Sequence, residues 1–427
     1  MSSSSWHRAL FPGLLLFGLS LALSKGASNV LLGVLYLSAI AGALYSKGFR
    51  DDIFRNCRQP LTAALGLFSL VAYIGIIHSG SYADGFRVAN KFVSLPAIYF
   101  LVSVLLQSDR SEEAGTRRAE SLLLSFLVGL AALNLLGVLT YLGVVGGAAF
   151  ALPLAPLGMH HIWYSNLNAL GLYTAAALLL FTRHGTSARG RALLGCFLLL
   201  STLCILLSTS RTAWFSVVLT AAIMAVVMIK HKKTMVAALL LSALAITAVY
   251  RFVPLVHDRV NLVASDLALY STNRHAESSI GGRLIMWHAA LSMAKSHPLV
   301  GVGTGDFVPE LIAMRRARLI PRFLLEFNQP HNIYLFSLAT NGIAGLAALL
   351  FIFYRSLRAA APLARREGSG KLLAFLAIAT AAHFIIAGFM DSLFNIQILR
   401  YSFAFIMGVC LRSATTGGRT EGPCPPP

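Results

Sequence analysis

The chain is dominated by long apolar stretches, each about as long as a helix that crosses a membrane. Such a helix needs about 20 predominantly apolar residues to span the hydrocarbon core. By this measure the 427 residues contain twelve candidate spans. They lie at 9–24, 28–45, 60–78, 88–107, 120–143, 165–181, 192–208, 213–229, 234–250, 332–354, 371–389 and 393–411. The sequence therefore predicts an all-α polytopic membrane protein with about twelve transmembrane helices.

The composition excludes several other classes of protein. Only 12% of the residues are charged, against about a quarter in soluble domains. The net charge of +19 does not indicate nucleic-acid binding, because the basic residues separate apolar runs instead of clustering on one water-exposed face. The five cysteines have no CxxC spacing, and the histidines have no HExxH spacing. We therefore predict neither a metal site nor a cofactor.

The distribution of basic residues predicts the orientation. Lys and Arg are enriched in short cytoplasmic loops of membrane proteins. With the N-terminus inside, most of the basic residues fall in alternate short loops on one side, and both termini are cytoplasmic. We expect the first span to remain uncleaved. The predicted organisation is nine helices over 1–250, an outer loop domain over 251–331, three helices over 332–411, and a disordered tail over 412–427.

The outer loop domain is predicted to contain short helices. Apolar residues recur at helical spacing over 281–296 and again over 306–320, where the second helix is basic and amphipathic. The glycine-rich run at 301–305 does not follow a strand of a βαβ unit, so it does not indicate a dinucleotide site. Two interpretations of it stay open, a small anion-binding nest and a plain turn.

Three side chains on the predicted outer face indicate chemistry. Arg211 lies in the tight turn between the seventh and eighth spans, Arg283 opens the first loop helix, and His331 begins the tenth span. Guanidinium groups bind phosphate oxygens in a bidentate manner and keep their charge, while a neutral histidine can accept a proton. Structural roles are the alternatives. They are a membrane-interface anchor for Arg211, a solvated charge or a partner of Glu277 or Asp266 for Arg283, and a helix cap for His331.

A second group of residues is assigned to substrate binding or positioning. Asn332 follows the histidine, and Asp391, in the outer turn before the last span, is placed either to orient His331 or to cap a helix. The arginines of the basic loop helix are candidates for contacts with an anionic acceptor, although a basic helix lying on the membrane surface is the competing interpretation. These arginines are Arg315, Arg316 and Arg318.

Four short motifs in order resemble bacterial O-antigen ligases, in a superfamily that also includes O-antigen polymerases. They are Ser-Arg-Thr at 210–212, Gly282-Arg283 with Trp287, the segment from Pro298 to Gly303, and His331-Asn332-Ile333-Tyr334-Leu335 followed by Asn341-Gly342. The resemblance implies a GT-C-like helical fold in the bacterial inner membrane with a periplasmic active site. It also implies metal-independent transfer of a glycan from undecaprenyl diphosphate to a lipid A core hydroxyl.

Carried over by position, the resemblance implies that Arg211 and Arg283 bind the diphosphate and that His331 is the base or orients the acceptor. An O-antigen polymerase would use the same donor and stays open as an alternative. A transporter or lipid flippase is the alternative from another class, because twelve spans are a common transporter plan. The spans contain almost no acidic residues, and the two halves differ, which argues against an ion-coupled carrier.

Overall fold

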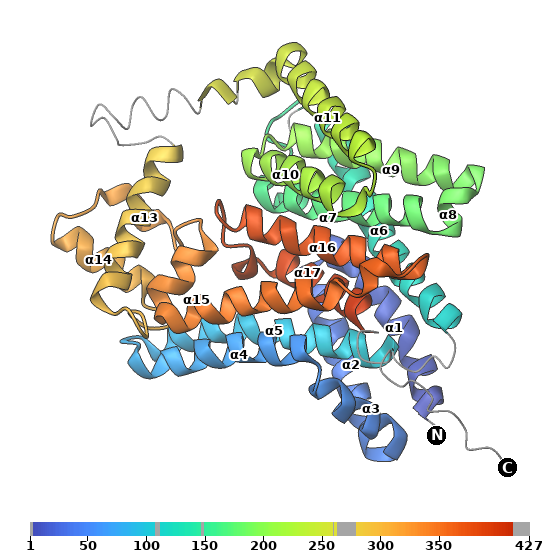
Figure 1. Ribbon diagram of the computed structural model, residues 1–427. Helices are drawn as coiled ribbons and strands as arrows, with labels where there is room; N and C mark the ends of the chain where they lie inside the picture. Colours follow the sequence, from blue (N-terminus) through green and yellow to red (C-terminus); the bar gives the residue numbers. More distant parts are fainter. Residues whose placement is uncertain (1–2, 107–111, 147–148, 259, 263–278, 413–427) are drawn as a thin grey trace.

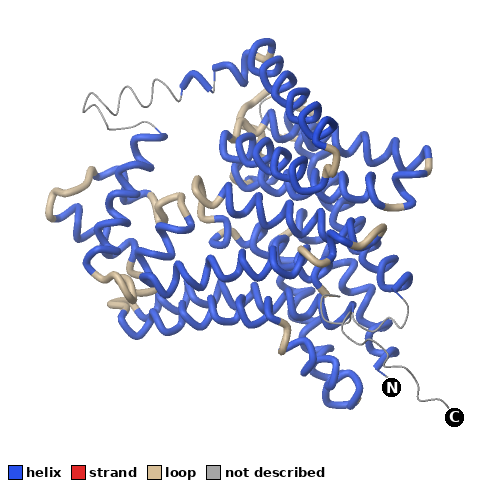
Figure 2. The backbone as a smooth tube through the Cα atoms, in the orientation of Figure 1, coloured by secondary structure: helices blue, strands red, loops and turns tan. Residues whose placement is uncertain are grey.

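Helices make up most of the described part of the protein, with loops and turns between them (Figure 2). A computed structural model describes residues 3–106, 112–146, 149–258, 260–262 and 279–412, and these contain no β-strand. The long helices are α1 (Ser3–Leu23), α2 (Lys25–Tyr45), α4 (Pro60–Ile74), α5 (Tyr82–Leu106), α6 (Glu112–Tyr141), α7 (His161–Phe181), α9 (Ala188–Leu207), α10 (Arg211–Met228), α11 (Lys232–Phe252), α15 (Ile333–Ala360), α16 (Ser369–Ala387) and α17 (Gln397–Leu411). Each overlaps one predicted span.

Ten of these twelve helical segments are long and apolar enough to cross a membrane, and the protein is a multi-pass membrane protein. The other two, α7 and α17, differ from the rest for physical reasons. Helix α17 has only 15 residues. Helix α7 buries several polar side chains, among them Ser165, Asn166 and Asn168, and these lower its hydropathy.

The remaining helices lie in the segments that connect these twelve. They are α3 (Lys47–Cys57), α8 (Arg183–Thr186), α13 (Ser279–Ser296), α14 (Phe307–Arg316), η1 (Gly75–His78), η2 (Pro156–Gly158), η3 (Arg322–Glu326), η4 (Leu363–Arg365) and η5 (Leu393–Asn395). In Figure 1, α13 and α14 lie at one end, and α3 and α8 lie at the other. The basic loop helices α3 and α8 are thus separated from the large loop by the length of the bundle.

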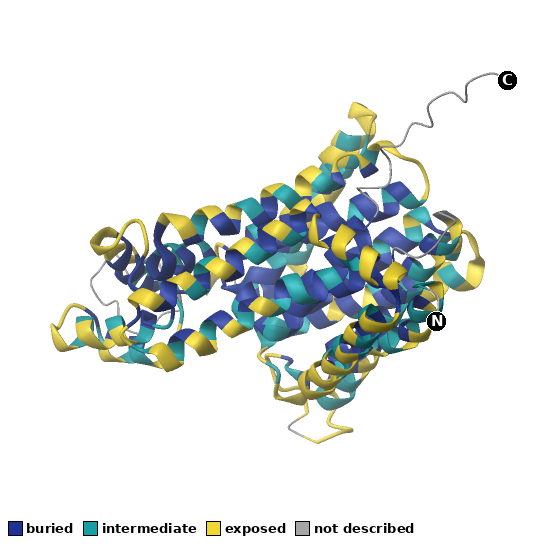
Figure 3. Cartoon of the chain, turned by 90° about the horizontal axis from the view of Figure 1, so that it is seen from below, coloured by how far each residue is buried: buried dark blue, intermediate teal, exposed yellow. Residues whose placement is uncertain are grey.

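Helices α16 and α17 form the centre of the bundle. Helix α16 contacts α7, α10, α15 and α17, while α17 also packs along α5. Most of the side chains on both helices are buried, whereas α11 has no buried residue. Figure 3 shows the buried residues gathered in the middle of the bundle and the exposed ones on its outer helices. The turn between the two helices buries the side chains of Asp391 and Ser392.

The two predicted loop helices are present, with one changed boundary. Helix α13 covers the prediction for 281–296, and its side chains Met286 and Ala290 are buried. Helix α14 ends at Arg316, four residues earlier than predicted. The chain leaves the helix there because Arg318 adopts a left-handed conformation with φ of +60°. The Leu319 amide then donates to the Met314 carbonyl at 2.9 Å and closes the helix end.

The glycine-rich run 301–305 is a packed turn. The amides of Val302 and Gly303 donate to the carbonyls of Ala339 and Thr340, and the Thr304 amide donates to the Gly75 carbonyl. These three donors are therefore occupied within the protein, which favours the turn over the anion nest. The run joins the outer loop to α15 and to η1.

Helix α15 is kinked where this turn approaches it. Gly342 has φ of +62° and ψ of −158° inside the helix, a combination that is essentially restricted to glycine. The backbone of Leu299 passes so close that a Cβ at this position would lie 2.3 Å from the Leu299 carbonyl carbon. A side chain at 342 is thus excluded by both conformation and space.

We expect Gly342→Ala to destabilise the protein by at least about 1–3 kcal/mol, the usual cost of a strained backbone position. The measurement is the thermal unfolding midpoint of the purified protein in detergent. Gly33→Ala is the matched control, because a Cβ there meets nothing within 4 Å and alanine favours a helix over glycine. An equal midpoint for the two variants would contradict this account of the kink.

Candidate active site

His331 and Asp391 form the centre of the candidate site. His331 Nδ1 lies 3.2 Å from Asp391 Oδ1, and the aspartate is almost fully buried in the α16–α17 turn. The same carboxylate oxygen accepts a hydrogen bond from the Ser392 amide at 2.8 Å. Asp391 thus contacts the histidine and accepts a backbone N–H of its own turn, but it is not the capping residue of α16 or of η5.

The backbone around His331 is held in an unusual conformation. His331 has φ of +49°, a left-handed value that costs energy for a residue with a side chain. The following residue, Asn332, caps α15 by accepting hydrogen bonds from the amides of Tyr334 and Leu335, both at 3.0 Å. The Ile333 amide donates to the Gly388 carbonyl at 2.8 Å. These contacts fix the entry of α15 and hold the imidazole against the α16–α17 turn.

Helix α13 brings Arg283 to the same place. One turn after the arginine, Trp287 Nε1 donates to the Pro330 carbonyl at 2.9 Å, so α13 is attached to the residue that precedes His331. Burial lowers the pKa of Arg283, nearby Arg211 lowers it further, and the Asp391 carboxylate opposes both effects. Arg283 thus lies within electrostatic range of both groups.

Arg211 reaches the cluster from the turn between α9 and α10. It is the first residue of α10, and the preceding Ser210 caps the helix by accepting from the Ala213 amide at 3.4 Å. The turn is itself attached to the start of α7, where His161 Nδ1 lies 2.9 Å from the Ser208 carbonyl oxygen. The positive charge of Arg211 lies at the N-terminus of α10, which is the positive end of the helix dipole. Both charges favour a bound anion at this point.

A second histidine, His160, belongs to the cluster and was not among the sequence-based candidates. Partial desolvation lowers its pKa, His331 lowers it further, and Asp391 raises it. Its Nδ1 accepts from the Ile162 amide at 3.3 Å, so its Nε2 carries the proton when the ring is neutral. The sequence contained one indication of this, because position 160 and Arg211 both fall in predicted outer loops.

The other candidates lie in different places. Asn332 uses both its oxygen and its nitrogen within the protein, the latter as a donor to the Phe389 carbonyl at 3.3 Å. Arg315 donates to the Ile320 carbonyl near the end of α14, and Arg316 and Arg318 are exposed there. Asn332 is thus placed to position His331, while the three arginines form a separate group at the end of α14 and just after it.

The cluster combines two guanidinium groups, one carboxylate and two histidines. Its charge is positive whenever the histidines are neutral. Asp391 is buried, Arg211, Arg283 and His331 are half-buried, and His160 is exposed. Within the described ranges, no three His, Cys, Asp or Glu side chains gather as metal ligands. Glu277 and Asp266, the alternative partners of Arg283, lie outside the described residues, as does the predicted tail from 413 onward.

Sequence comparison finds a matching family. Residues 196–350, a little over a third of the chain, match the family described as O-Antigen ligase. This match supports a place for the chain in the O-antigen ligase and polymerase superfamily. The matched region includes Arg211, Arg283 and His331.

A curated relative adds a second, shorter similarity. It is an uncharacterized protein of Haemophilus influenzae (strain ATCC 51907 / DSM 11121 / KW20 / Rd), 29% identical over 97 residues. The match covers 23% of this chain and 24% of the relative. The chain therefore spans about a quarter of the length of that relative.

Proposed function

We propose that the protein is an O-antigen ligase. It transfers polysaccharide from undecaprenyl diphosphate to a hydroxyl of the lipid A core, at the periplasmic face of the bacterial inner membrane. The observation that carries the proposal is the meeting of Arg211, Arg283 and the His331–Asp391 pair, from four separate segments of the chain. The family match supports the reaction class.

The two arginines bind the diphosphate of the donor. Negative charge develops on the diphosphate as the glycosidic bond to it breaks, and fixed positive groups stabilise that charge. Arg211 and Arg283 repel each other when no ligand lies between them, so an anion bound by both relieves the repulsion. Neither can serve as the base, because arginine keeps its proton.

His331 is the general base. Its Nδ1–H donates to Asp391, which leaves Nε2 to accept the proton of the acceptor hydroxyl. The hydroxyl oxygen attacks the anomeric carbon, the new glycosidic bond forms, and the bond to the diphosphate breaks. The electron pair leaves with undecaprenyl diphosphate, and the sugar configuration inverts. Asp391 stabilises the imidazolium that results, and the reaction requires no metal or other cofactor.

The orientation of the protein follows from its basic loops. The basic helices α3 and α8 lie at the end of the bundle opposite α13 and α14, and the positive-inside rule assigns the basic end to the cytoplasm. Both termini are then cytoplasmic. The partners are the lipid-linked glycan, the lipid A core and membrane lipids.

Deletion of the gene in its own host separates ligase from polymerase. We expect lipopolysaccharide with an unsubstituted core, together with full-length polymer that stays on undecaprenyl diphosphate. Electrophoresis of lipopolysaccharide, and of the lipid-linked glycan, measures both. A core that carries a single repeat unit would instead identify a polymerase and would overturn the proposal.

A further inference from the structure

Two cations lie close together between helices, on a face of the bundle other than the one that carries the candidate active site. Arg400, in the first turn of α17, is only 4% exposed, and half-buried Lys91 of α5 feels its positive charge. Arg400 Nε donates to Ser94 Oγ at 2.8 Å, and its Nη1 donates to the Phe394 carbonyl at 2.5 Å. These bonds hold the guanidinium group between α5 and α17.

The pair has no negative partner in the described part of the chain. Lys91 is repelled by Arg400 and also by Arg87, and neither Lys91 nor Arg400 forms an ion pair there. Arg87 differs, because it is exposed and pairs with Asp84 at 2.8 Å. A charge within a membrane helix is costly unless it is paired. Two adjacent like charges therefore favour an anion from outside the chain.

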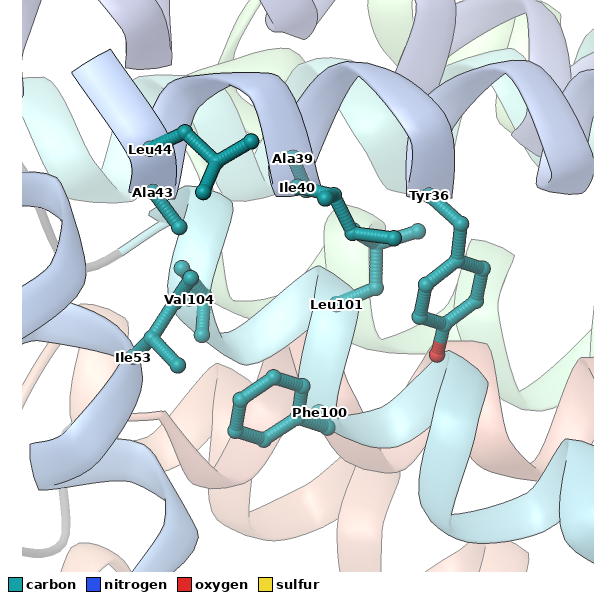
Figure 4. Close-up of a pocket in the computed structure, with 9 residues that line it drawn as sticks. All are labelled: Tyr36, Ala39, Ile40, Ala43, Leu44, Ile53, Phe100, Leu101 and Val104. Carbon is teal, nitrogen blue, oxygen red and sulfur yellow. The ribbon is translucent and has the colours of Figure 1, made fainter. Parts of the chain in front are cut away.

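An apolar groove lies further along α5. It has a volume of about 310 Å³ and is lined by side chains of α2, α3 and α5. Figure 4 shows Tyr36 at one end, Phe100 beside the middle, and Leu44, Ile53 and Val104 toward the other end. The Tyr36 hydroxyl is the single polar side-chain group of the lining, and that oxygen is buried without a hydrogen-bond partner. This groove suits a hydrocarbon chain.

Tyr401 connects the cations to the groove. Arg400 lies over the Tyr401 ring, with its guanidinium carbon 5.8 Å from the ring centre. The Tyr401 hydroxyl donates to Asn29 of α2 at 2.9 Å, about two helical turns before Tyr36 on the same helix. The polar pair and the apolar groove are therefore neighbouring parts of one surface on α2, α5 and α17.

We propose that an anionic phospholipid of the membrane binds this surface, with its phosphate on Lys91 and Arg400 and a hydrocarbon chain in the groove. Charge complementarity indicates an anionic headgroup, because neither cation pairs with a carboxylate of the described residues. Arg400 lies about one turn inside α17, near the depth of a headgroup. The proposed lipid is separate from the glycan donor, and its binding does not depend on glycosyl transfer.

The test measures lipid binding to the delipidated full-length protein in detergent, by native mass spectrometry. Dioleoylphosphatidylglycerol should bind more tightly than dioleoylphosphatidylcholine. A basic residue at a membrane surface contributes about a fivefold gain in binding. Lys91→Gln should therefore weaken phosphatidylglycerol binding about fivefold, and Lys91→Gln with Arg400→Gln about 25-fold. Arg87→Gln is the matched control, and it should change the affinity less than twofold.

The groove has its own pair of variants. Ala43→Phe fills it and should weaken phosphatidylglycerol binding, whereas Leu37→Phe, on the exposed side of the same helix, should not. Lys91→Gln alone decides the question if the double variant does not fold. Unchanged binding in Lys91→Gln, or equal binding of the two phospholipids, would overturn the proposal. Displacement of phosphatidylglycerol by equimolar undecaprenyl phosphate would also overturn it, and would assign the surface to the donor lipid.

Discussion

Replacement of His331 by alanine is expected to lower the rate of glycan transfer by about 10²–10⁴-fold, the usual contribution of a general base. The variant loses the group that accepts the proton, while Arg211 and Arg283 still bind the donor. Complementation of a deletion strain shows the loss as missing polymer-bearing lipopolysaccharide. Transfer from lipid-linked glycan to lipid A core by purified protein measures its size.

Two further variants interpret the His331 result. His288→Ala is the control, because that histidine is exposed on α13 outside the cluster, and it should keep wild-type activity. Asp391→Asn keeps the shape of the side chain but removes the charge that faces the imidazole, so its loss should be smaller than that of His331→Ala. Full restoration of polymer-bearing lipopolysaccharide by His331→Ala would remove the histidine from the mechanism.

Replacement of Arg283 or Arg211 by lysine is expected to lower transfer by about 10²–10³-fold, the usual effect of losing one donor that stabilises a transition state. Lysine keeps the positive charge but loses the planar fork that holds two phosphate oxygens at once. The measurements are the initial transfer rate and the apparent affinity for the lipid-linked donor.

The arginine variants need a control for charge and for folding. Arg322→Lys makes the same substitution at an exposed position in η3, and its transfer rate should be unchanged. Size-exclusion profiles and thermal midpoints of the variants should match the wild type. Wild-type rates in both Arg211→Lys and Arg283→Lys would contradict bidentate recognition of the diphosphate.

The helices could be predicted from the sequence because apolar runs of span length have few other solutions in a membrane. All twelve predicted spans coincide with a long helix. Helix ends and kinks could not be predicted in this way, because hydropathy contains no information about local backbone geometry. Helix α14 ends early because Arg318 turns left-handed, and α15 is kinked at Gly342 because Leu299 passes against it.

The site was predictable only in part. Arg211, Arg283 and His331 were singled out by residue type and by their shared face, and the structure brings them together around Asp391. His160 was missed because a histidine before a span has no distinctive pattern. Its place in the cluster depends on the attachment of α7 to the α9–α10 turn through His161. Sequence alone could not decide whether Arg315, Arg316 and Arg318 contact an anionic acceptor or belong to a basic helix on the membrane surface.

The side of the membrane on which the cluster lies is the claim on which the whole account depends. Single cysteines can be introduced at the exposed positions Asn328 and His288 of the outer loop domain in an otherwise cysteine-free protein. The native Cys57 of α3, also exposed, is kept as the single cysteine of a third variant. A membrane-impermeant maleimide is then applied to cells with a permeabilised outer membrane. We predict labelling at 328 and 288 and protection at 57 until the inner membrane is opened. Labelling of Cys57 with protection at 328 and 288 would place the cluster in the cytoplasm and contradict the account.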